Sequence, residues 1–147
     1  MADVYSITTT STAVAIATPQ TLLQLEAPSD KRVRLQFLSV SFDGAASATP
    51  AKVHLLRQTT AGTATTDTAT PLDMDAPAAG TTCRRLYTVE PTDGDILFSW
   101  FATPSGSAFS ISFAPGEEPV IPESGRLAVK VESQVGLNAF ASMQFAE

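Results

Sequence analysis

Apolar and polar residues alternate along most of this chain with a period of two, which is the spacing of a β-strand. The alternation is clearest in 31–42, 108–113, 125–132 and 137–145. Turn residues such as Pro, Gly, Asp and Ser separate these runs from further predicted strands at 5–10, 12–17, 21–27, 52–58, 83–90 and 95–102. No segment shows a helical period. We therefore expect one all-β domain over residues 1–147, a β-sandwich of jelly-roll or related Greek-key topology.

The longest predicted strand, 31–42, changes phase part-way along. Its apolar residues begin at odd positions, with Val33, Leu35 and Phe37, and then move to even positions, with Leu38 and Val40. Side chains of a strand alternate between its two faces, so a change of phase requires a bulge or a strong twist. We place this irregularity near residues 37 and 38.

The segment 95–102 is apolar at almost every position, which predicts a strand that is covered on both faces. Strict alternation places Ile96, Phe98 and Trp100 on one face, which we assign to the core. It places Leu97 and Phe101 on the other face. Apolar residues opposite a core face are typical of a contact surface, so we predict that Leu97 and Phe101 lie in an interface.

The segment 59–82 consists mainly of Thr and Ala, with two prolines and two glycines, and has no sustained period. We expect one long irregular loop here, a length that is uncommon inside a compact domain. It is either a surface loop without a role or an arm that a neighbouring subunit orders. In the second interpretation Leu72 and Met74 are its apolar anchors. Residues 1–12 are a second candidate arm.

Charged residues make up only 16% of the chain, against about a quarter in typical domains. The net charge is −6, and the two basic clusters, 31–34 and 84–85, are short. We expect no nucleic-acid binding, because this requires clustered Lys and Arg to neutralise phosphates. We also find no apolar run long enough to span a membrane and no signal peptide, so we expect synthesis in the cytoplasm.

The residues that usually perform catalysis are scarce. His54 is the single histidine and lies within a predicted strand, so we interpret it as a structural residue. One histidine and one cysteine exclude a zinc site of His or Cys type. A Ser-His-Asp triad would have to use His54, and no Gly-x-Ser-x-Gly motif identifies a nucleophile. We therefore expect a protein that is not an enzyme.

Two other features of the sequence are candidate sites. Cys83 precedes Arg84 and Arg85, which would lower the pKa of an exposed thiol, but a buried small residue is the favoured interpretation. The carboxylate pairs 73/75 and 93/95 have alternate spacing that calcium ligands use, yet neither forms a complete binding loop. We predict no cofactor and no metal site.

Three stretches, 33–44, 53–63 and 125–147, give the chain its resemblance to the small virion proteins of tailed bacteriophages. Among these it is most similar to head decoration (cement) proteins. The resemblance implies a protein on the capsid surface of the virion, made in the host cytoplasm. Its partners would be the major capsid protein and further copies of itself, as a trimer that bridges neighbouring capsid subunits.

The alternative function is a carbohydrate-binding or lectin-like β-sandwich module, for instance on a phage tail or fibre. Such a module would present exposed aromatic side chains, for which Trp100 is the single tryptophan candidate. A hydrolase built on a jelly roll is a third and weaker alternative.

Overall fold

The computed structural model describes residues 2–43, 48–105 and 108–147, and in these residues the regular structure consists of β-strands. This confirms the predicted all-β sandwich. No helix of the described chain is long and apolar enough to cross a membrane. The strands, in chain order, are β1 (Val4–Thr8), β2 (Thr12–Val14), β3 (Gln20–Glu26), β4 (Val33–Asp43), β5 (Ala51–Gln58), β6 (Thr63–Thr68), β7 (Thr70–Pro71), β8 (Thr82–Val89), β9 (Asp93–Ala102), β10 (Phe109–Ser112), β11 (Val120–Ile121), β12 (Arg126–Glu132) and β13 (Leu137–Ala146).

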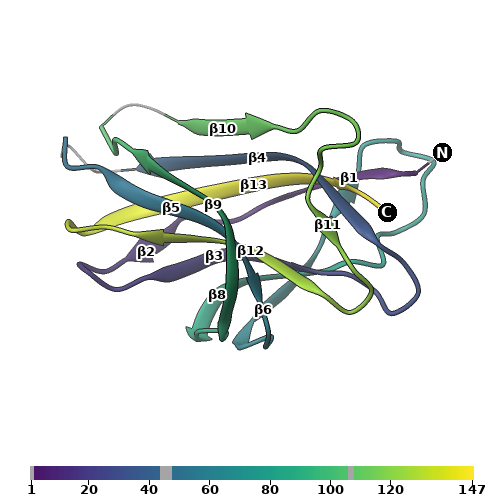
Figure 1. Ribbon diagram of the computed structural model, residues 1–147, viewed down its shortest axis with the longest axis horizontal. Coiled ribbons are helices and arrows are strands. Elements are labelled where there is room, and N and C mark those ends of the chain that lie inside the picture. Colours follow the sequence, from purple (N-terminus) through teal and green to yellow (C-terminus); the bar gives the residue numbers. More distant parts are fainter. Residues whose placement is uncertain (1, 44–47, 106–107) are drawn as a thin grey trace.

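The strands form two antiparallel sheets (Figure 1). Sheet 1 has the order β10-β4-β13-β1-β7, with β11 paired to β4 and β2 paired to β13. Sheet 2 has the order β6-β8-β3-β12-β5-β9. Among the described strands, β9 and β10 are therefore sheet edges. They lie on the same side of the sandwich, joined by the connection after Ala102 (Figure 1).

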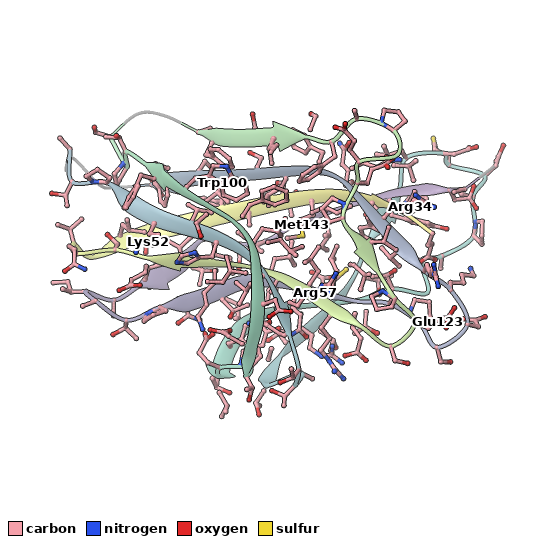
Figure 2. The ribbon with its side chains drawn as sticks, viewed as in Figure 1. Arg34, Lys52, Arg57, Trp100, Glu123 and Met143 are labelled. Carbon is pink, nitrogen blue, oxygen red and sulfur yellow. The ribbon has the colours of Figure 1, made fainter. Side chains whose placement is uncertain are left out.

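The core lies between the two sheets and is built from alternate residues of their strands. In β12, Leu127, Val129 and Val131 are buried inward, and in β13 every second residue from Leu137 to Phe145 is buried. Phe145 stacks on Tyr5 of β1 with ring centroids 5.7 Å apart. Figure 2 shows the side chain of Met143 in the middle of the sandwich. The period-two pattern thus identified the inward-facing residues.

The predicted irregularity in β4 is confirmed one residue from where we placed it. Phe37 pairs with Gln144, but Leu35 pairs with the next residue, Phe145, so Gln36 is the extra residue of a bulge. The bulge lets Val33 and Leu35 on one side of it and Leu38 on the other all point into the core, where each is fully buried.

The structure differs from the two predicted arms. Residues 4–8 form β1, which pairs with β13 and β7, and Tyr5 is buried in the core. Within 59–82, residues 63–68 form β6 at the edge of sheet 2, and 70–71 form β7 in sheet 1. The expectation of one irregular loop was wrong because β6 is exposed on both faces, so it has no apolar alternation. An irregular connection remains at 72–81, between β7 and β8.

Candidate functional site

Strand β9 presents several exposed apolar side chains on one stretch of the surface. Three of its large apolar side chains are exposed: Ile96 by 57%, Phe98 by 42% and Phe101 by 72%. Along the described residues β9 pairs only with β5, so the backbone groups on its other side form an open sheet edge. A long edge strand with exposed apolar side chains is a typical place for another chain to bind.

An aromatic cluster closes the side of the sandwich between the edge strands β9 and β10. The ring of Trp100 on β9 lies 4.5 Å from that of Phe109 on β10 and 5.8 Å from that of Phe98, between centroids. Phe98 also contacts Phe113, at 5.8 Å. Figure 2 shows Trp100 directed toward β10. The rings hold the two sheet edges together where no backbone pairing joins them.

The predicted faces of β9 were partly wrong. Phe98 pairs with Leu55 and Ile96 with Leu56, so Leu97 is the extra residue of a bulge. Because of this bulge Leu97 is half-buried and packs against the core, on the side where Trp100 also lies. Ile96 is moved to the outer face. Of the two interface residues predicted on β9, the structure leaves Phe101 exposed and places Leu97 inward.

The connection 72–81 carries the other two predicted interface residues, and both are exposed: Leu72 by 55% and Met74 by 96%. Its first end is fixed at β1, where the Leu72 amide donates to the Val4 carbonyl at 2.8 Å. Its other end is fixed by the carboxylate of Glu147, which accepts hydrogen bonds from the backbone amides of Gly80 and Thr81 at 2.6 and 2.9 Å.

The middle of this connection is also held. The hydroxyl of Tyr5 donates to the carbonyl of Pro77 at 3.2 Å, and the Asp73 side chain accepts from the Asp75 amide at 3.0 Å. The predicted anchors Leu72 and Met74 are therefore presented on a turn that is fastened to the sandwich. Asp73, a candidate calcium ligand by its spacing in the sequence, stabilises that turn with its carboxylate.

A polar cluster that the sequence did not suggest lies on the outer face of sheet 2, beneath the connection from β8 to β9. The ammonium of Lys130 lies 2.7 Å from the carboxylate of Asp93 and 3.7 Å from that of Glu90. Glu90 also accepts a 2.6 Å hydrogen bond from the hydroxyl of Thr21, which is fully buried. Asp93, the other calcium candidate, is thus already paired with a cation.

Buried amides extend the cluster toward β8. Gln24 and Gln58 share a 2.7 Å hydrogen bond, and Gln58 also donates to Asp93 at 3.1 Å. Beyond them, Glu26 accepts from Arg84 at 2.7 Å and from Arg126 at 2.6 Å. Burying amides and charges is costly unless they are bonded in this way, so the cluster fixes the β8–β9 connection in one position.

His54 and Ser99 form a cross-strand pair on the same outer face, with Nδ1 and Oγ 2.6 Å apart. Burial lowers the pKa of His54, and the nearby Lys52 lowers it further. A neutral imidazole bonded to a serine hydroxyl is one element of a nucleophilic site. The pair sits beside a small pocket of about 180 Å³ that Ile96, Lys130 and Glu132 help to line.

Cys83 lacks the exposed, cationic surroundings of a reactive thiol. It is completely buried in the core, and burial raises its pKa to about 12, with Asp67 adding to the effect. The neighbouring arginines point elsewhere: Arg84 bonds Glu26 and Arg85 bonds Asp67. Within the residues that the structure describes, no group of three His, Cys, Asp or Glu side chains is arranged to hold a metal ion.

Comparisons of the chain with protein families, with characterised proteins and with solved structures give no match.

Proposed function

We propose that this chain is a structural virion protein that binds the outside of a phage capsid and stabilises it by bridging neighbouring capsid subunits. The observation that carries the proposal is the fastened connection 72–81, with its exposed Leu72 and Met74. The low charge content supports it as well, because neutral surfaces lose less hydration when they are covered in an assembly.

The fastening makes this connection suited to binding. Ordering a mobile segment costs about 1–2 kcal/mol per residue of backbone entropy. Hydrogen bonds to Val4, Tyr5 and Glu147 already hold 72–81 in place, so a partner does not have to supply that ordering. Covering a side chain of the size of Leu72 or Met74 is worth about 1.5–3 kcal/mol. Two such side chains at the end of a rigid turn form a compact anchor.

The carbohydrate-binding alternative finds less support in the geometry. A sugar platform requires an aromatic face that is open to solvent. The ring of Trp100 is stacked with Phe98 and tilted onto Phe109, which leaves it half-buried. Phe101 is the most exposed aromatic ring of the described chain, but the ammonium of Lys52 lies over it, 5.7 Å from its centroid. One face of this ring is therefore already occupied by a cation.

Immunogold electron microscopy tests the proposal directly. Phage particles from the source of this chain are purified on a density gradient and labelled with antibody against the recombinant protein. We expect gold on the heads, and heads stripped of the protein should release DNA at a lower temperature than intact ones. Label on tails alone would favour the glycan-binding alternative, and particles without label would contradict both.

A pair of variants tests the role of the anchor. Leu72→Ser with Met74→Ser should fold normally and lose binding to stripped heads, because both side chains are exposed. Val89→Ser, which changes a side chain exposed by 58% on β8, is the matched control and should bind normally. Equal binding of both variants would show that this connection does not contact the capsid.

A further inference from the structure

We infer that strand β9 is a self-pairing edge, through which two copies of this chain associate in antiparallel fashion and join their six-stranded sheets into one. The proposal concerns the free protein in buffer, so it is independent of capsid binding. Its dimer differs from the trimer that the resemblance implies. It assigns a partner to the exposed apolar side chains of β9, which the fold of one copy leaves uncovered.

The outer face of β9 is defined by its pairing with β5. Ile96, Ser99 and Phe101 lie opposite Leu56, His54 and Lys52 respectively. These three residues of β5 alternate with Val53 and Leu55, which are fully buried in the core. Ile96, Ser99 and Phe101 therefore share the outward face, with Ser99 between the two exposed apolar residues.

This spacing is self-complementary about Ser99. When two β9 strands run antiparallel with Ser99 opposite Ser99 of the second copy, Ile96 of each copy lies opposite Phe101 of the other. The bulge residues Leu97 and Phe98 of one copy together then lie opposite Trp100 of the other. Inward-facing residues therefore meet inward-facing residues, and outward-facing residues meet outward-facing residues. Without the bulge, Ile96 and Phe101 would point to opposite faces and this register would fail.

In this register the second copy would cover the exposed apolar side chains of β9. Ile96, exposed by 57%, and Phe101, exposed by 72%, would form two cross-strand pairs related by the twofold axis. Phe98, exposed by 42%, would meet aromatic rings of the second copy at the side of the sandwich that the aromatic cluster closes.

The charges favour the same orientation. Carboxylates of Asp93 and Asp95 lie at the start of β9, and the ammonium of Lys52 lies over the ring of Phe101 near its end. Antiparallel pairing sets Asp95 of each copy next to the Phe101–Lys52 pair of the other. A parallel arrangement would instead bring the carboxylates of both copies together. The other edge of sheet 2, β6, offers no opposite charge: its single charged residue, Asp67, is an acid that is already bonded to Arg85.

Oligomeric mass and cysteine cross-linking test the register together. The purified protein should have twice the chain mass of 15.4 kDa by light scattering. Phe101→Lys should give monomers, since edge lysines oppose strand pairing. Val89→Lys, at an exposed site on β8, should leave the dimer intact. Circular dichroism checks that both variants stay folded.

Ser99→Cys should form a disulfide-linked dimer on mild oxidation. Residues directly opposite in an antiparallel pair have Cα atoms about 4.5–5.5 Å apart, within the range of a disulfide. Ser110→Cys, on the edge strand β10, is the matched control and should stay unlinked. A wild-type mass of one or three chains would overturn the proposal. So would a dimer that survives Phe101→Lys, or one that Ser99→Cys fails to link.

Discussion

The ammonium of Lys130 on β12 lies 2.7 Å from the carboxylate of Asp93 at the start of β9, across the outer face of sheet 2. The Lys130 side chain is only 11% exposed, so this ion pair is partly shielded from water. Asp93→Asn should lower the free energy of unfolding by about 1–3 kcal/mol, because a largely buried cation loses its nearest partner. Urea unfolding measures the change. Asp30→Asn, in an exposed turn, is the control and should change it by less than about 0.5 kcal/mol.

The single histidine should make stability depend on pH. Burial lowers the pKa of His54, so the unfolded chain, with an ordinary pKa of 6.5, binds a proton more readily than the folded one. The resulting loss of stability should be absent well above pH 6.5, begin as the pH falls through 6.5 and level off below the folded pKa. NMR titration should give a value below 6.5, and His54→Gln should remove this part of the pH dependence. A measured pKa at or above 6.5 would contradict the prediction.

Cys83 should resist thiol reagents as long as the protein is folded. Its side chain is fully buried and burial raises its pKa to about 12, so almost no thiolate exists at pH 8. Labelling with a chromogenic disulfide should be slow in buffer and complete within the mixing time in denaturant. The exposed cysteine of the Ser110→Cys variant provides the internal comparison. Rapid labelling of wild-type protein in buffer would show that the core opens readily.

Gly62 should be the more sensitive of two glycines with positive φ. Its φ is +65°, and a Cβ there would lie 2.5 Å from the carbonyl oxygen of Val89. Gly116 has φ +92° and no atom within 4 Å of such a Cβ. Gly116→Ala should cost only the backbone strain, about 1 kcal/mol, whereas Gly62→Ala adds a clash between β6 and β8. Thermal unfolding should therefore show a clearly larger loss for Gly62→Ala, and equal losses would contradict this account.

Strands with one face in the core were predicted well from the sequence. In β12 and β13 one face meets the other sheet, so apolar residues occur at every second position of the sequence. Strand β6 shows no such alternation. Its Thr-rich residues are held by pairing with β8 and by the bond between Asp67 and Arg85, and neither has a periodic signature.

The candidate sites show the same division. The exposed Leu72, Met74 and Phe101 were predictable because apolar residues in a loop or opposite a core face stand out. The inward position of Leu97 was not, because it depends on one extra residue in β9, and alternation alone does not locate a bulge. The cluster around Lys130 and Asp93 joins segments 37 residues apart, so only the folded chain reveals it.

The position of β13 in sheet 1 bears on how the protein folds during synthesis. This strand lies between β4 and β1 and pairs with both, yet it is the last of the thirteen described strands to be made. The part of sheet 1 that contains β1, β13 and β4 therefore cannot form until residues 137–146 have left the ribosome. Pairing over such sequence separations is slow compared with local hairpin formation. The nascent chain should accordingly need protection from aggregation until its translation has passed β13.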